Sequence, residues 1–161
     1  MYDDNRVYKE YVSQTFNRTA PSYDRVGPRF FSYFGNRLVE LAGVCNGASV
    51  LDVGCGRGAI LFPAAEKVGT SGEVIGIDIA EMMLQQTAND IGGLGLENAR
   101  VCYMDSEALH FPEVCFDFVI CGFALYEFYD LDPALAESFR VLKPKGVFAA
   151  SLWGRNVDTR W

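Results

Sequence analysis

The stretch that decides the fold is Val50-Leu51-Asp52-Val53-Gly54-Cys55-Gly56-Arg57-Gly58, a short apolar strand that runs into a glycine-rich turn. Glycines in such a turn permit positive φ angles and remove the Cβ atoms that would keep a ligand away from the backbone N–H groups. Gly54, Gly56 and Ala59 also satisfy the G-x-G-x-x-G/A pattern of dinucleotide-binding proteins. The turn therefore predicts a nucleotide-like ligand, and by itself it leaves open which one.

Asp52, two residues before the first glycine, favours one kind of ligand over another. A carboxylate at this place fits badly beside a pyrophosphate, whereas it suits a ligand that carries an ammonium or a sulfonium group. The alternative is that Asp52 only orders the glycine turn by accepting backbone N–H bonds.

From Ala48 onward, short apolar segments alternate with helical patterns. Strands buried on both faces read as continuous apolar runs, and their alternation with helices implies parallel strands joined by right-handed crossovers. The sequence therefore predicts an open α/β fold with a mostly parallel sheet. Its predicted strands are 48–53, 73–77, 99–104, 116–121 and 146–152, and its predicted helices are 59–68, 80–91 and 133–142.

The first 45 residues predict two further helices, separated by a break at 19–27. Pro28 fits the first turn of the second helix. We expect residues 1–45 to form an N-terminal helical cap on a cofactor-binding α/β domain, 46–161, within one folding unit. The alternative is that both helices pack on the sheet as ordinary core. The apolar positions are Val7, Tyr8, Tyr11, Val12 and Phe16 in the first helix and Phe30, Phe31, Phe34, Leu38 and Leu41 in the second.

Candidate ligand-binding side chains follow the second and third predicted strands. Ligands of open α/β sheets bind at the carboxyl ends of the strands. Asp78 ends the second strand and suits hydrogen bonds from two ribose hydroxyls, unless it caps the helix that begins near Ala80. Asp105 and Ser106 follow the third strand, where a carboxylate suits the exocyclic amine of adenine; alone, the pair reads as a turn. The aromatic segment 120–128 forms either a wall beside a reacting group or plain core.

The charge balance excludes several partners. With 14 Lys and Arg against 21 Asp and Glu, the net charge is −7, and no basic patch offsets it. We therefore expect no nucleic-acid partner and no membrane-surface role. The longest stretch without a charged residue, 41–51, is too short for a membrane helix, and the N-terminus lacks the apolar core of a signal peptide. The expected location is the cytoplasm.

Cysteine and histidine usage argues against disulfide bonds and metal sites. The five cysteines are odd in number and form no C-x-x-C pair, so we expect reduced thiols used as small core residues. His110 is the only histidine, and no Cys/His cluster has the spacing of metal ligands. We expect no metal.

Four segments in order carry a resemblance to a known family. They are 50–58, then Gly76-Ile77-Asp78-Ile79-Ala80, then 104–112 with Phe116-Asp117-Phe118-Val119-Ile120, then Val141-Leu142-Lys143-Pro144-Lys145-Gly146. Together they resemble class I S-adenosylmethionine-dependent methyltransferases, and among these the small-molecule group typified by the ubiquinone/menaquinone C-methyltransferases. The resemblance covers about residues 10–155. It implies a doubly wound, Rossmann-like sheet, S-adenosylmethionine as cofactor, and methyl transfer to a small, apolar acceptor.

The resemblance also implies roles for matching residues. The glycine turn would approach the methionine part of the cofactor, Asp78 would hold the ribose, and Asp105 would accept from the adenine amine. Tyr23 lies in segment 16–24, which resembles the family segment that folds over the cofactor. The implied cofactor-binding set is Tyr23, Asp52, Gly54, Cys55, Gly56, Asp78, Ile79, Met83, Asp105, Ser106, Cys121 and Phe123. No catalytic residue is assigned; the candidates for a general base are Tyr23, Asp24, Tyr126 and Glu127.

The chain departs from the family at its last strand. Family members usually add a further helix and two antiparallel strands there, and this chain lacks them. An apolar edge strand with no neighbour is prone to pair with another chain. The sequence is therefore expected to be a fragment or to form a homodimer through this strand. Two alternatives to an active methyltransferase stay open: an NAD(P)-dependent reductase with the same glycine turn, and a truncated, non-catalytic cofactor-binding fragment.

Overall fold

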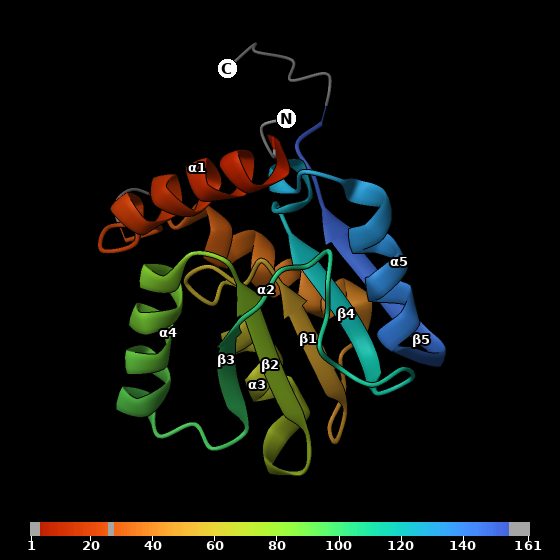
Figure 1. Ribbon diagram of the computed structural model, residues 1–161. Helices are drawn as coiled ribbons and strands as arrows, with labels where there is room; N and C mark the ends of the chain where they lie inside the picture. Colours follow the sequence, from red (N-terminus) through yellow and green to blue (C-terminus); the bar gives the residue numbers. More distant parts are fainter. Residues whose placement is uncertain (1–3, 26–27, 155–161) are drawn as a thin grey trace.

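A single five-stranded sheet forms the centre of the molecule. The computed structural model describes residues 4–25 and 28–154 (Figure 1). In the described chain the strands follow the order β3-β2-β1-β4-β5, and every neighbouring pair is parallel. Their bounds are Ser49–Val53 for β1, Glu73–Asp78 for β2, Ala99–Tyr103 for β3, Phe116–Gly122 for β4 and Leu142–Ser151 for β5. The predicted open parallel α/β sheet is confirmed.

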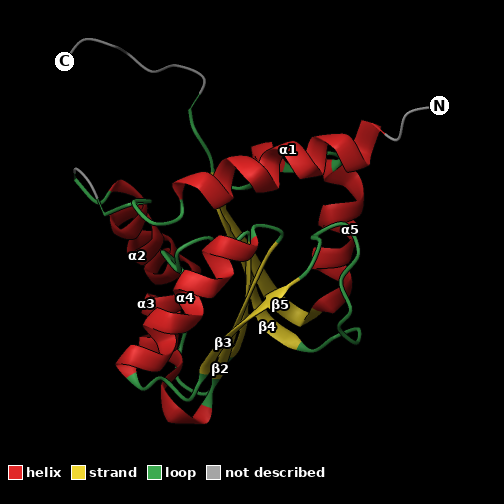
Figure 2. Ribbon diagram, turned by 60° about the vertical axis from the view of Figure 1, so that its left-hand side comes forward, coloured by secondary structure: helices red, strands yellow, loops and turns green. Residues whose placement is uncertain are grey.

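Helices cover both faces of this sheet, as Figure 2 shows. The first face carries α2 (Phe30–Ala42), α3 (Leu61–Val68) and α4 (Glu81–Leu94), and the other carries α5 (Leu131–Val141). Alternation along β1 explains the two layers, because successive side chains point to opposite faces. Val50 joins the core beneath the first three helices, whereas Leu51 joins the core on the side of α5. The doubly wound arrangement is thus confirmed.

Several predicted element ends are wrong. α3 begins at Leu61 rather than at residue 59. α2 begins at Phe30 rather than in the turn with Pro28, because Arg29 adopts a left-handed conformation with φ of 51°. α4 runs through Gly92 and ends at Leu94, because the next residue, Gly95, has φ of 64°. A left-handed glycine after the last turn is a common helix stop, whereas the two earlier glycines lie within the helix. α5 begins at Leu131, earlier than predicted, because Pro133 falls inside its first turn. β5 begins at Leu142, earlier than predicted, because the lysine-rich sequence at its start resembles that of a loop.

α2 packs on the sheet near β4 and β5 and also against α3. A Cβ atom on Gly35 would overlap the carbonyl oxygen of Ala59, so the glycine lets the helix lie directly on the segment that leads into α3. The alternative that the sequence left open, in which the helix packs on the sheet as ordinary core, therefore holds for α2.

α1 (Asp4–Thr19) lies across the carboxyl ends of the strands (Figure 1). Three polar side chains spaced by four residues attach it there: Lys9 to Asp105, Ser13 to the carbonyl of Ile79, and Asn17 to the N–H of Met82. Val12 is buried beside this polar stripe. The predicted apolar face is partly wrong, because Val7 and Tyr11 are 52% and 66% exposed. The helix is therefore seated by hydrogen bonds as much as by apolar packing.

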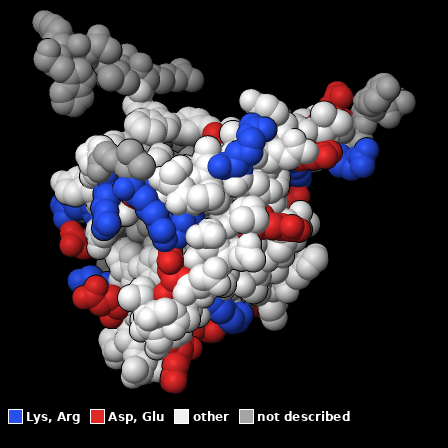
Figure 3. All heavy atoms as spheres, turned by 90° about the vertical axis from the view of Figure 1, so that its left-hand side faces the viewer, with Lys and Arg blue, Asp and Glu red and all other residues white. Residues whose placement is uncertain are grey.

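Charged side chains of both signs share the surface. On the face shown in Figure 3, basic residues lie beside acidic ones around a hollow. No helix in residues 4–25 and 28–154 has the length and apolar character needed to cross a membrane.

Candidate functional site

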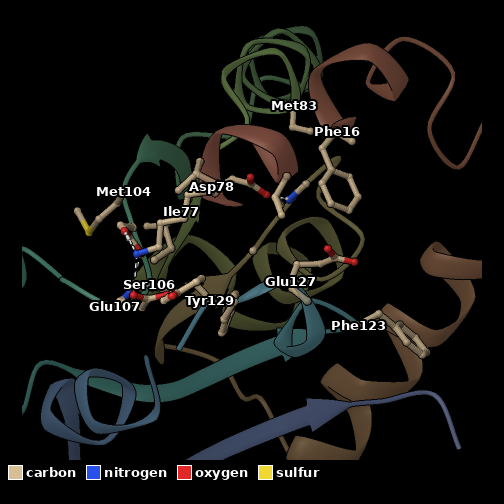
Figure 4. Close-up of a pocket in the computed structure, with 18 of the residues that line it drawn as sticks. Phe16, Ile77, Asp78, Met83, Met104, Ser106, Glu107, Phe123, Glu127 and Tyr129 are labelled. Carbon is tan, nitrogen blue, oxygen red and sulfur yellow. Dashed lines mark hydrogen bonds and ion pairs between the residues drawn. The ribbon is translucent and has the colours of Figure 1, made fainter. Parts of the chain in front are cut away.

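A cavity, here called cavity 1, lies between α1 and the carboxyl ends of β1, β2, β3 and β4. Figure 4 shows Phe16 and Met83 on one side of it and Tyr129 and Glu127 on the opposite side, with Asp78 between them. The topology explains the location, because the strand order reverses beside β1 and the loops of neighbouring strands diverge there.

The glycine turn after β1 is folded over the end of β2. The N–H groups of Gly54 and Cys55 both donate to the carbonyl of Ile77 at 2.9 Å. Gly54 has φ of 71°, and a Cβ atom there would lie 2.5 Å from the Cβ of Ala124. Only glycine satisfies both conditions, and the turn consequently presents bare backbone to the cavity.

Asp78 connects this turn to the start of α4. Its Oδ2 accepts the N–H of Gly56 at 2.9 Å, and its Oδ1 accepts the N–H of Ala80 at 2.8 Å. Burial raises the pKa of this carboxyl group, although the bonds from Ala80, Gly56 and Ile79 oppose the rise. Asp78 therefore lines cavity 1 and also makes the local bond that the capping alternative anticipated.

Asp105 lines the far end of cavity 1, after β3. Its Oδ1 accepts the N–H of Glu107 at 2.9 Å, which is the turn that a lone Asp-Ser suggests, and its Oδ2 lies 2.7 Å from the ammonium of Lys9. Lys9 also donates to Glu107 at 2.6 Å. Burial alone would lower the pKa of Lys9, but the hydrogen bonds to both carboxylates raise it. This ion-pair cluster ties α1 to the rim of the cavity.

A second cavity, cavity 2, adjoins the first between the glycine turn and the start of α2. Asp52 and Arg57 line it, and their buried Oδ2 and Nε atoms have no hydrogen-bond partner in the described structure. The guanidinium of Arg57 also donates to the carbonyl of Ala20 at 2.8 Å and pairs with Asp90. Burial, and next the charge of Asp78, raises the pKa of Asp52 to about 8. The buried carboxyl group of Asp52 and the buried guanidinium of Arg57 therefore both line cavity 2.

The structure brings together eleven of the twelve residues predicted to bind the cofactor. Asp52 and Cys55 line cavity 2. Cys121 lines neither cavity and lies fully buried in the core on the side of α5. The period-2 alternation of β4 is the reason, since its neighbour Gly122 is the residue that faces both cavities. The nine that line cavity 1 are Tyr23, Gly54, Gly56, Asp78, Ile79, Met83, Asp105, Ser106 and Phe123.

Several lining residues were missed by the sequence reasoning. The helical spacing of α1 offered a signal only for Val12 and Phe16, which the apolar pattern includes. Lys9 reads as an ordinary surface lysine, and Glu107 as part of a turn. The other missed residues that line cavity 1 are Ile77, Met104 and Tyr129, whereas Gly122, Ala124 and Phe128 lie in segment 120–128, for which the sequence offered a wall as one alternative.

The four candidates for a general base have different surroundings in the structure. Asp24 is used structurally, because its carboxylate accepts the N–H groups of Phe31 and Ser32 at the start of α2. Tyr126 donates its hydroxyl to the carbonyl of Trp153. Burial, and then Asp24 and Asp78, raises the pKa of Tyr23 to about 12, so its hydroxyl stays protonated near neutral pH. Glu127 lines cavity 1.

Aromatic rings gather where the two cavities meet. Phe123 lines both cavities and lies 5.5 Å from the ring of Phe30 and 4.9 Å from that of Trp153. Phe30 also stacks on Trp153 at 5.0 Å. Segment 120–128 is therefore divided: Ile120 and Cys121 belong to the core, whereas 122–124 and 127–128 form a wall of the site.

Comparisons with known proteins place the chain among methyltransferases. Residues 45–157 match a family described as "Methyltransferase domain". Aklanonic acid methyltransferase DauC of Streptomyces sp. (strain C5) is 42% identical over 88% of this chain and 64% of its own length. Demethylmenaquinone methyltransferase of Listeria welshimeri is 33% identical over 88% of this chain and 61% of its own length. The chain thus spans less than two thirds of either relative.

A solved structure agrees with these matches. The crystal structure of a SAM dependent methyltransferase from Aquifex aeolicus superposes with a TM-score of 0.79 at 27% identity, covering 90% of this chain and 77% of that chain. The family resemblance seen in the sequence is confirmed. The chain belongs to the methyltransferase-domain family.

Proposed function

We propose that this chain binds S-adenosylmethionine and transfers its methyl group to a small, apolar acceptor. The observation that carries the proposal is the convergence of Asp78, Asp105 and the glycine turn on one cavity beneath α1. These groups come from the ends of three separate strands. A single extended ligand with a ribose, a base and a charged tail accounts for all of them.

The residues of cavity 1 fit the nucleoside part of this cofactor. The Asp78 carboxylate accepts backbone N–H bonds from Gly56, Ala80 and Ile79, but its two oxygens offer about four lone-pair sites, so the group remains able to accept from the ribose. Asp105, with Ser106 beside it, would accept from the adenine amine. Ile79 and Met83 supply apolar surface for the base.

The residues of cavity 2 fit the amino-acid part. The unpartnered Asp52 Oδ2 suits an ammonium, and the unpartnered Arg57 Nε suits a carboxylate. Buried polar atoms are normally hydrogen-bonded, so a ligand that supplies both partners removes an energetic cost. Cys55 borders the same space, whereas Cys121, which the resemblance placed on the methyl side, lies behind Gly122.

When bound, the cofactor supplies an electrophilic methyl group on a positively charged sulfur. The chain's contribution is positioning and exclusion of water, because correct placement of two reactants is worth on the order of 7–11 kcal/mol of barrier. α1 covers the ends of the strands, and Phe123 with its ring neighbours offers apolar surface for an acceptor. Of the candidate bases, we favour Glu127, since it lines cavity 1 and Asp24 caps α2.

The reductase alternative loses support. The matched family is one of methyltransferases, and the relatives' names describe methyl transfer to small molecules. A truncated fragment that binds the cofactor without turnover remains the second candidate, because the chain spans less than two thirds of its curated relatives.

The proposal extends to the chain's organisation and surroundings. We propose that the cap 1–45 and the domain 46–161 fold as one unit, supported by the contact of Gly35 with Ala59. The five free cysteines and the net charge of −7 support a cytoplasmic location and the absence of a nucleic-acid partner. The edge of β5 that faces away from β4 supports a homodimer.

Binding measurements with two ligands test the proposed function. Titration calorimetry with S-adenosylhomocysteine should show binding, and NAD(H) at the same concentration should show none. Saturable binding of NAD(H) without binding of S-adenosylhomocysteine would overturn the assignment. Binding of S-adenosylhomocysteine with no methyl transfer to any apolar acceptor tested would favour the non-catalytic fragment.

A further inference from the structure

Cavity 2 gathers the buried polar atoms that lack a hydrogen-bond partner. Within the described residues they are Asp52 Oδ2, Arg57 Nε and Ser151 Oγ, and all three residues line this cavity. Leaving a buried donor or acceptor unmatched is costly, and native structures contain few such atoms. Three in one cavity therefore indicate a place built for a polar occupant.

Asp52 is the most enclosed of these groups, at 1% exposure. The N–H of Leu61, at the start of α3, donates to its carboxyl group, while Oδ2 faces no donor. Asp78, on the adjacent strand, is a second, half-buried acid close enough to repel a charge on Asp52. Two neighbouring carboxylates in a low dielectric favour retention of a proton on one of them.

The proton belongs on Asp52 rather than on Asp78. Asp78 accepts backbone N–H bonds from Gly56 and Ala80, which stabilise its ionised form, whereas Asp52 has only the bond from Leu61. Burial followed by the charge of Asp78 raises the pKa of Asp52 to about 8, in agreement with the geometry.

Among the described residues, the charge that acts on the pKa of Asp52 is that of Asp78, and none of the cations lining cavity 2 lowers it. Arg57 lines the same cavity, but its guanidinium pairs with Asp90 of α4 and donates to the carbonyl of Ala20. Arg25, from the segment before α2, pairs with the same Asp90. The remaining charged or titratable groups facing this space are Asp24 and Arg29 before α2, Tyr23 after α1, Cys55 after β1 and, behind the cavity on β4, the buried Cys121.

We propose that Asp52 is protonated in the ligand-free protein near neutral pH and ionises when the ammonium end of the ligand enters cavity 2, so that binding releases one proton. The inference rests on the proposed function, because it takes the ligand to be an adenosyl amino acid. In the step, the O–H bond of Asp52 breaks, the proton passes to the solvent buffer, and the carboxylate pairs with the ligand's ammonium. No other reactant is needed.

The coupling makes affinity depend on pH in a defined direction. While Asp52 is protonated, each unit of pH increase lowers the free-energy cost of ionising it, so affinity for an ammonium-bearing ligand rises by up to about tenfold per unit and then levels off near pH 8. The affinity for a nucleoside without the amino-acid end does not rise with pH. The site thereby distinguishes the charged tail from adenosine alone.

Titration calorimetry in two buffers of different ionisation enthalpy measures the released proton. The probes are S-adenosylhomocysteine and 5′-methylthioadenosine, which lacks the amino-acid end, between pH 6 and 7.5. For the wild-type chain we expect release of close to one proton with the first probe and none with the second. Asp52→Asn, which keeps the side chain's shape, should release none and should show a flat pH profile.

Asp105→Asn serves as a matched control in cavity 1: it should bind S-adenosylhomocysteine more weakly yet release the same proton. Binding of that probe to the wild-type chain without proton release, or equal release by Asp52→Asn, would overturn the inference and leave the proposed function standing. Failure of both probes to bind the wild-type chain would overturn the proposed function, and the inference with it.

Discussion

The ammonium of Lys9 on α1 lies 2.7 Å from the Asp105 carboxylate, which follows β3 and is separated from Lys9 by 96 residues. Glu107 accepts from the same ammonium, and its other oxygen accepts the N–H of Asp130. One lysine thus fastens the N-terminal helix to the loop after β3, and Glu107 links that loop to the start of α5. The attachment is polar and partly exposed, so its strength is open to direct measurement.

Lys9→Met should loosen α1 while leaving the sheet intact. We expect faster amide hydrogen exchange across residues 4–19 and a loss of about 1 kcal/mol in unfolding free energy, since partly exposed ion pairs contribute little more. Arg18→Met is the control, because the described hydrogen bond of Arg18 is to Thr15 within α1. Equal exchange in both variants would show that Lys9 does not hold the helix.

Asp78→Asn should weaken binding of S-adenosylhomocysteine by about 1.5–3 kcal/mol, as loss of a charged hydrogen-bond acceptor does. The substitution preserves the shape of the side chain beside Gly56 and Ala80. Calorimetry gives the affinity, with Asp132→Asn on the exposed start of α5 as control. Unchanged affinity in Asp78→Asn would remove Asp78 from the site.

Asp52 makes folding stability fall as pH rises. Its pKa goes from 3.8 in the unfolded chain to about 8 in the folded one, so between these values the folded state holds the extra proton. The unfolding free energy then decreases with pH, by about 1.4 kcal/mol per unit from this group at most. The effect is absent below pH 4 and complete above pH 8. Urea unfolding from pH 5 to 8 should show a shallower decline for Asp52→Asn, and parallel slopes would contradict the burial argument.

Two glycines in helices predict opposite effects of the same substitution. Gly35→Ala should destabilise the fold by about 2 kcal/mol, because the new Cβ would meet the backbone carbonyl of Ala59. Gly92→Ala should stabilise it by about 0.5–1 kcal/mol, because open space surrounds that position in α4. Thermal unfolding of the two variants checks both signs. A stabilising Gly35→Ala would mean that α2 does not lie against this segment.

The edge of β5 predicts self-association. Sedimentation should show dimers of the wild-type chain, and Val147→Lys should favour monomers by placing a charge on the exposed strand. Val7→Lys, the same change at an exposed position of α1, should leave the dimer intact. A monomeric wild-type chain would rule out pairing through β5.

The sequence predicted the sheet and most of the site for identifiable physical reasons. Parallel strands buried on both faces leave apolar runs, and acids at their carboxyl ends must converge, which is why Asp78 and Asp105 were found. Cys121 was misplaced because a one-residue difference in register reverses the face, and no local signal separates it from Gly122. Lys9 was missed because its partners lie in a loop that is distant in the sequence, and an isolated lysine in a helix predicts only a solvated surface.

Cavities 1 and 2 share Tyr23, Gly54, Gly56, Gly122 and Phe123 as a common partition. Adenosine and a free amino acid, offered as two separate molecules, would each forfeit translational freedom to occupy their own half. A covalent tether between them converts the second capture into an intramolecular event, with gains that reach several orders of magnitude without any new contact. The two adjoining cavities therefore bind a ligand that is long enough to occupy both of them more tightly than they bind its two parts.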